Sequence, residues 1–313
     1  MTHVTFIHGI GNKPKAKELH DIWLRSLATG AGGIDLGGEG VTSSMVYWAD
    51  VLYADPDPNV AAYESFEATT AKEVEADATA RTPIPATIDE ASFISGLALK
   101  LGGTLAAAET VEAIPPNREL DGMPYERIPL PWPIKKAFME TFLRDVHHYL
   151  FNVEFTPRPG TTFKVQDEIR KRFVKAVAEG SKSGEPQIVV SHSMGTVIAY
   201  DCLKRVPGIK KIDGFMTIGS SLGLDEIQDK LRPEWSRPNG FPSERVEGGW
   251  VNVFDRLDPV AGFDPFLKND YQRDGKGDIE DVAVLNEGAW RHSIVKYLRA
   301  PDLRKGVEKL LAL

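Results

Sequence analysis

Six short apolar runs are spaced along the chain, and most lack the alternation of apolar and polar residues that marks a strand with one wet face. Such runs are typical of strands covered on both faces of a sheet. The predicted strands are Val4–Ile7, Ser44–Trp48, Ile188–Val190, Gly214–Ile218, Trp250–Phe254 and Val282–Leu285.

Between and after these runs, apolar residues recur every three or four positions, which predicts helices. In Lys15–Thr29, for example, Leu19, Ile22, Trp23 and Leu27 share one face. The other predicted helices are Phe163–Glu179, Thr196–Arg205, Ser293–Arg299 and Leu303–Leu311. Strands that alternate with helices predict an α/β fold with a doubly wound, mostly parallel sheet.

Residues 50–162 interrupt this alternation. They contain an acidic, alanine-rich segment, two helical patterns and the proline-rich run "IPPNRELDGMPYERIPLPWP". We therefore expect a core of residues 1–49 and 163–313, and a largely helical cap of residues 50–162 above the carboxyl edge of the sheet. A shorter excursion, residues 222–249, is expected on the same side as a smaller cap loop.

Two alternatives stay open for the apolar segment Phe93–Ala108 of this cap. It is too short for a membrane span and contains Lys100 and three glycines, so no integral membrane segment is predicted. One alternative is a cap helix packed on the core. The other is a lid that faces substrate or makes transient contact with a membrane.

Composition narrows the class of protein. The chain has 313 residues, 42% hydrophobic and 26% charged, which is typical of a globular protein. A net charge of −8 disfavours nucleic acid as a partner, and also simple electrostatic docking on anionic lipid. Cys202 is the single cysteine, so an internal disulfide is excluded. The start, "MTHVTFIHGIG", lacks the pattern of a signal peptide, and we expect a cytoplasmic protein.

The run "IVVSHSMGTVIAY" leads a buried strand into a helix through Ser191-His192-Ser193-Met194-Gly195. Polar residues at a strand end can be turn chemistry alone. A serine nucleophile, however, needs a tight strand-to-helix turn with small residues two before and two after it. Ser191 and Gly195 meet that requirement. The following helix adds a positive N-terminal end, and the Met194 N–H would face a developing oxyanion.

This segment resembles the nucleophile elbow Gly-x-Ser-x-Gly of the α/β-hydrolase superfamily, with Ser191 in place of the first glycine. The resemblance covers the predicted core and does not extend to the insertion. Within the superfamily, "TIGSSLGL" and "NVFDRLDPVAG" are most similar to the lipase-type branch that includes the GPI inositol deacylases.

The resemblance implies the remaining site residues. In "FIHGIGN", the family forms the second half of its oxyanion hole from the backbone N–H of the residue after the His-Gly pair, which is Ile10. In "WVNVFDRLDPVAG", the acid is Asp258, with Asp255 as the alternative. In "NEGAWRHSIVKYL", the general base is His292. The order Ser193, Asp258, His292 is that of the α/β-hydrolases.

The remaining histidines suit the role of general base less well. His192 adjoins the nucleophile, and His8 belongs to the oxyanion segment. The others precede the first strand or lie on helical patterns: His3, His20, His147 and His148.

Two other motifs point to ligands less strongly. The glycine-rich turn after the first strand lacks the Gly-Lys-Ser/Thr ending of a phosphate loop. The run "DYQRDGKGDIED" has the spacing of a calcium loop, with Asp270, Gln272, Asp274, Gly275, Asp278 and Asp281 at the ligand positions. Its third position is weak and its last is not glutamate, so we expect an exposed turn. No metal or cofactor is predicted.

The function expected from these residues is a serine hydrolase that cleaves carboxylic esters in the manner of an esterase or lipase, through an acyl-enzyme. Its partner would be an ester or lipid-like small molecule. The same residues leave open an amide or thioester hydrolase, an acyltransferase, or a non-catalytic binding protein on a hydrolase scaffold.

Overall fold

A computed structural model describes residues 2–63, 76–110, 132–181, 184–287 and 290–312. Its main sheet has six strands, and every pairing between neighbours is parallel. In the order β2-β1-β5-β6-β7-β8, the strands are Thr42–Val46, His3–Ile7, Gln187–His192, Ile212–Ile218, Val246–Phe254 and Ile279–Ala283. The predicted α/β fold with a doubly wound sheet is confirmed.

The central strands are mostly apolar because the sheet has a hydrophobic core on each face, whereas the edge strands β2 and β8 are more polar and less buried. Successive side chains of a strand point to opposite faces. In β5, Ile188 and Val190 belong to one core, while Val189 between them belongs to the other. In β1, Phe6 and Ile7 divide in the same way. Both cores are buried, so neither face shows the alternation expected of a half-exposed sheet.

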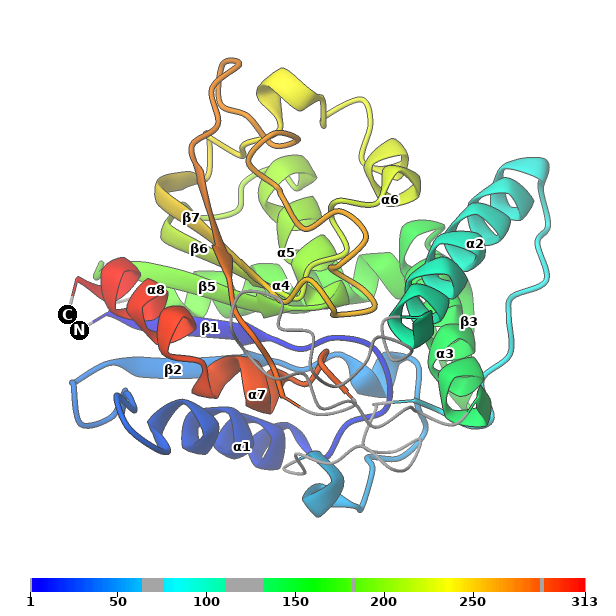
Figure 1. Cartoon of the computed structure of the whole chain (residues 1–313), viewed down its shortest axis with the longest axis horizontal. Coiled ribbons are helices and arrows are strands. Elements are labelled where there is room, and N and C mark those ends of the chain that lie inside the picture. The colour runs from blue at the N-terminus through cyan, green and yellow to red at the C-terminus, as the bar shows by residue number, and fades with distance from the viewer. Residues whose placement is uncertain (1, 64–75, 111–131, 182–183, 288–289, 313) are drawn as a thin grey trace.

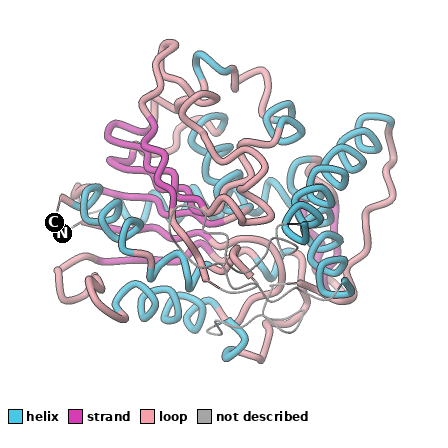
Figure 2. Tube along the Cα trace, in the orientation of Figure 1, coloured by secondary structure: helices cyan, strands magenta, loops and turns pink. Residues whose placement is uncertain are grey.

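Five helices of the core cover the two faces of the sheet (Figures 1 and 2). Residues of α1 (Ala16–Ala28), α7 (Ile294–Arg299) and α8 (Pro301–Leu311) pack in one core. Residues of α4 (Val165–Gly180) and α5 (Met194–Arg205) pack in the other. Each of these helices matches a predicted one to within a few residues.

Two long helices form the insertion, α2 (Ile88–Thr110) and α3 (Trp132–Leu150). Figure 1 places both chain termini at one end of the sheet and these helices beyond the other end, towards which β1 runs. The proline-rich run lies largely outside the described residues, as does the first part of the acidic, alanine-rich segment. No helix within the described ranges is both long enough and apolar enough to cross a membrane.

The helix α2 packs its apolar side on its surroundings. Phe93, Leu97 and Leu101 are buried, and Leu99 is 78% exposed on the other side. Lys100 forms ion pairs with Asp225 and Glu226, which both lie in the excursion of residues 222–249. These contacts suit a helix packed on the core, and the opening of a lid stays a prediction.

Two elements were not expected from the sequence. An antiparallel hairpin of β3 (Glu154–Arg158) and β4 (Thr161–Lys164) follows α3, with Gly160 at φ 77° in its turn. Phe163 therefore lies in a strand, and the predicted helix begins two residues later. A short helix, α6 (Asp225–Lys230), interrupts the second excursion. Both are too short to stand out by periodicity.

Candidate active site

The strand order places a topological switch point at the carboxyl ends of β1 and β5. The next strand in the chain, β2, pairs with one edge of β1, and β5 later pairs with the other edge of β1. Ligands of open α/β sheets bind at such a switch point. The register pairs Ile7 of β1 with Ser191 of β5, so the loop after β1 and the bend after β5 lie side by side.

Ser193 lies at a sharp bend between β5 and α5. Its backbone has φ 54° and ψ −129°, a conformation that costs a non-glycine residue about 1–3 kcal/mol. Backbone bonds hold it there: the Ser193 N–H donates to the Ile218 carbonyl at 2.9 Å, and the Thr196 hydroxyl donates to the Ser193 carbonyl at 2.6 Å. These bonds help to stabilise the bend that presents the Ser193 hydroxyl.

Close backbone approach explains the small residues around Ser193. A Cβ on Gly195 would lie 2.6 Å from the His8 carbonyl oxygen, and one on Gly9 would lie 2.6 Å from the Ser193 Cβ. Both positions therefore require glycine. Ser191 is accommodated because its hydroxyl donates to the Met216 carbonyl at 2.8 Å.

The structure brings Ser193, His292 and Asp258 together in one hydrogen-bonded chain. The Ser193 Oγ lies 2.8 Å from Nε2 of His292. Nδ1 of His292 lies 2.7 Å and 2.9 Å from the two carboxylate oxygens of Asp258. Because a carboxylate only accepts, Nδ1 carries the proton and Nε2 is the acceptor for the serine hydroxyl. All three side chains are buried.

Asp258 is held as a carboxylate. Burial alone would raise the pKa of Asp258, but the adjacent His292 and the hydrogen bonds to the carboxylate outweigh it and lower the pKa. The donors include the hydroxyl of Tyr297 at 2.7 Å and the backbone N–H of Val260 at 2.7 Å. An anion in this position favours one tautomer and one orientation of His292.

The alternative acid, Asp255, has other partners. Its carboxylate forms an ion pair with Arg291 at 3.2 Å and accepts the backbone N–H of Asn286 at 2.7 Å and of Leu257 at 2.8 Å. These bonds stabilise the turns on either side of the site. The geometry thus places Asp258, rather than Asp255, against His292.

Sequence reasoning missed Tyr297, which joins the two aspartates. Its hydroxyl donates to Asp258 and accepts the backbone N–H of Asp255 at 2.9 Å. Burial, reinforced by the charges of both aspartates, raises the pKa of Tyr297 well above its usual value, so the group stays a donor. The signal was present in "HSIVKYL", where the tyrosine lies one to two helical turns after His292.

Two further histidines lie at the site in supporting positions. His192 donates from Nε2 to the backbone carbonyl of His292 at 3.0 Å. His8 is stacked on Trp48 and accepts its backbone N–H at 3.0 Å. Burial lowers the pKa of both rings well below the usual range, so both are neutral.

The other histidines have partners elsewhere in the fold. His3 and His20 contact hydroxyl side chains of β2, and His147 pairs with Glu90 of α2. His148 lies against the Phe155 ring of the hairpin.

The insertion contributes a wall of the site. The Phe138 ring of α3 lies 6.1 Å from the ring of His292 and 4.7 Å from that of Trp290, centroid to centroid. Ile10 and Met194 are also fully buried. Met194 begins α5, where backbone N–H groups have no partner within the helix. The oxyanion role of Ile10 and Met194 stays a prediction.

Two of the residues with calcium-loop spacing, Asp270 and Asp281, bind other groups of this chain. Asp281 accepts the backbone N–H groups of Leu267 and Lys268, and Asp270 pairs with Arg237. Within the part of the chain that the structure describes, no three His, Cys, Asp or Glu side chains form a group that could hold a metal.

No protein-family model matches the sequence, and no curated protein matches it. Among solved structures, the chain is similar to an uncharacterized protein from Pseudomonas aeruginosa, with 9% identity and a TM-score of 0.25. The match covers 81% of this chain and 36% of that one, so this chain spans little more than a third of its neighbour. A likeness at this identity and TM-score does not bear on the chemistry of the site.

Proposed function

We propose that the protein is a serine hydrolase of the α/β-hydrolase type that cleaves carboxylic esters. One observation carries the proposal: an unbroken hydrogen-bonded chain from the Ser193 hydroxyl through His292 to Asp258, at the switch point of the sheet. A nucleophile, a base and a group that orients the base, within hydrogen-bond reach, are the recurring requirement of acyl transfer.

The reaction would follow from these positions. Ser193 Oγ attacks the acyl carbon while Nε2 of His292 takes the hydroxyl proton. Asp258 stabilises the imidazolium that forms. The backbone N–H groups of Ile10 and Met194 stabilise the oxyanion of the tetrahedral intermediate. His292 then returns the proton to the departing alcohol, and a water molecule, activated by the same base, releases the acid from Ser193.

The wall of the site favours an apolar substrate group. Phe138 and Trp290 present aromatic surface beside His292 and offer no charge to a ligand. Because Ser193 is fully buried, an ester can reach it only if part of the surrounding wall moves. We therefore expect esters with an aliphatic or aromatic acyl group, and turnover limited by access for bulky ones.

Hydrolysis of p-nitrophenyl esters of graded chain length tests the proposal. Ser193→Ala should lose activity about a million-fold, since triad members act as a unit. Ser26→Ala is the matched control, because Ser26 is a buried serine of α1 that donates to the Ile22 carbonyl. The proposal would be contradicted if Ser193→Ala hydrolysed esters at the wild-type rate, or if the wild-type protein hydrolysed none of them.

A further inference from the structure

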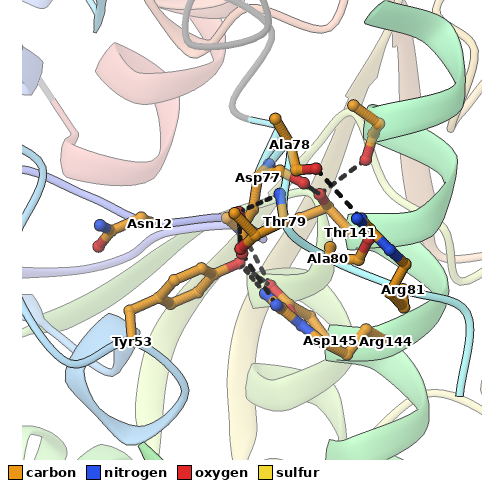
Figure 3. Close-up of polar contacts among 12 residues, drawn as sticks. Asn12, Tyr53, Asp77, Ala78, Thr79, Ala80, Arg81, Thr141, Arg144 and Asp145 are labelled. Carbon is orange, nitrogen blue, oxygen red and sulfur yellow. Dashed lines mark hydrogen bonds and ion pairs between the residues drawn. The ribbon is translucent and has the colours of Figure 1, made fainter. Parts of the chain in front are cut away.

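A buried carboxylate of the insertion reaches the loop that follows β1. Asp145 of α3 is fully buried, and its Oδ2 accepts the backbone N–H of Gly11 at 2.9 Å. The same oxygen accepts the hydroxyl of Tyr53 at 3.0 Å, and Oδ1 accepts Nε of Arg144 at 3.0 Å and lies 2.9 Å from Nη2 in an ion pair. Figure 3 shows Tyr53, Arg144 and Asp145 pointing toward one another.

A second layer of bonds holds Asp145 in place. The guanidinium of Arg144 lies 4.8 Å from the centre of the Tyr53 ring and donates to the tyrosine hydroxyl. It also pairs with Asp77 at 2.9 Å, and the Asp77 backbone N–H donates to the Thr141 hydroxyl (Figure 3). Burial and the charge of Asp145 raise the pKa of Tyr53 well above its usual value, so its hydroxyl remains a donor.

The contact with Gly11 fixes a peptide plane next to the proposed oxyanion donor. The Gly11 N–H and the Ile10 carbonyl belong to the same planar unit. Asp145 holds the N–H end, and the Lys13 ammonium donates to the carbonyl end. The Ile10 N–H belongs to the preceding plane, so only the torsions at the Ile10 Cα separate the donor from the anchored unit.

Gly9 and Ile10 are closely packed, but packing constrains the end of this loop, at Gly11 and Asn12, less tightly. Gly9 and Gly11 carry no side chain, and Gly11 has φ 82°, a region that glycine enters freely. A cavity of about 370 Å³ adjoins Asn12 and is lined also by Tyr53 and Asp77. The end of the loop therefore has free space beside it, and the hydrogen bond from Gly11 to Asp145 helps to fix its position.

We propose that Asp145 is a positioning residue that aims the Ile10 N–H at the substrate carbonyl by anchoring the Gly11 N–H. This inference rests on the proposed function, and it gives the insertion a part in the chemistry. A displaced oxyanion donor weakens the transition state more than the bound substrate, because the charge on oxygen develops only during attack.

Asp145→Asn tests this positioning role, because an amide cannot accept at both ends and presents an NH₂ group to the surrounding donors. Removing an oxyanion donor outright costs about 100–1,000-fold in kcat, so we expect a displaced one to cost about 10–100-fold. KM should change less than about three-fold, because the substitution does not alter groups that bind the substrate in its ground state. The inhibition constant of a trifluoromethyl ketone, which forms a tetrahedral adduct, should rise in step with the loss of kcat/KM.

Asp201→Asn is the matched control. Asp201 is an equally buried carboxylate that accepts a tyrosine hydroxyl, from Tyr149 at 2.6 Å, and an arginine, Arg170 at 2.7 Å. It should lower stability by a similar amount and leave kcat and the inhibition constant of the surviving enzyme unchanged. If Asp145→Asn does not fold, Tyr53→Phe replaces it, and Tyr149→Phe is its control. We expect Tyr53→Phe to lower kcat about three-fold to ten-fold.

Amide hydrogen exchange separates this inference from the proposed function. The peptide that contains Gly9 to Asn12 should exchange at least ten-fold faster in Asp145→Asn, or in Tyr53→Phe, than in the control variant. Unchanged exchange of this peptide, or equal losses of kcat in the Asp145 and Asp201 variants, would overturn the positioning role. A wild-type protein without ester hydrolysis would refute the proposed function alone, and the exchange experiment would still decide whether Asp145 anchors the loop.

Discussion

Replacing Tyr297 with phenylalanine removes a single oxygen that joins the two aspartates of the site. Asp258 would lose a hydrogen bond of 2.7 Å, and the backbone N–H of Asp255 would lose its acceptor at 2.9 Å. A hydrogen bond to a charged group contributes about 1.5–3 kcal/mol, and a buried donor left unpaired costs about 1–3 kcal/mol. Since the two effects share one oxygen, we expect a loss of about 3 kcal/mol in the free energy of unfolding.

For a chain of this length, that loss corresponds to a fall in Tm of about 5 °C. Activity should fall less than about ten-fold, because Asp258 keeps His292 and the N–H groups of Val260 and Ala261 as donors. The assay is thermal and urea unfolding, followed by ester hydrolysis per active site. Tyr200→Phe is the control, because its buried hydroxyl donates to a neutral carbonyl at 2.6 Å and should contribute about 1 kcal/mol. Equal destabilisation by the two variants would refute the bridging role of Tyr297.

Three further outcomes are expected. Asp258→Asn should lower kcat about 10,000-fold, as measured by ester hydrolysis. Asp255→Asn should instead lower the free energy of unfolding by about 3 kcal/mol in urea, because it breaks a buried ion pair; the opposite result would exchange the two roles. Gly195→Ala should destabilise by about 2–3 kcal/mol because its Cβ would meet two carbonyl oxygens, and Gly103→Ala, with open space around it on α2, should stabilise by about 0.5–1 kcal/mol. Burial lowers the pKa of Lys296 to about 8, so between pH 8 and 9.5 the unfolded chain binds more protons and stability should rise with pH; Lys296→Met should remove that rise, and an unchanged slope would contradict the shift.

The sheet was predictable because its central strands are buried on both faces. That environment makes runs such as Val4–Ile7 and Trp250–Phe254 mostly apolar, with one buried polar residue in each, and these runs are visible in the sequence alone. The bend at Ser193 was equally visible, since close backbone approach restricts the residues near it to small ones. Features set by local packing and chain geometry are therefore recoverable from one sequence.

Contacts between distant segments were not recoverable in this way. Asp145 meets Gly11 across 134 positions, and nothing in a helical pattern distinguishes its carboxylate from a solvated one. Phe138 lies in one of the helical patterns of the insertion, but its contact with His292 depends on how that helix packs against the core. The hairpin at Glu154–Arg158 and Thr161–Lys164 has strands too short to compete with a neighbouring helical pattern.

Covalent labelling by a fluorophosphonate probe tests the central claim most directly. The probe's phosphorus bonds to an activated serine Oγ and releases fluoride, so a single adduct should appear by intact mass spectrometry. Peptide mapping should place it on Ser193, and Ser193→Ala should not be labelled, while Ser26→Ala should be labelled at the wild-type rate. Asp258→Asn should slow labelling strongly, because the base then loses its orienting partner. A folded wild-type protein that gives no adduct, or an adduct that persists in Ser193→Ala, would contradict the account.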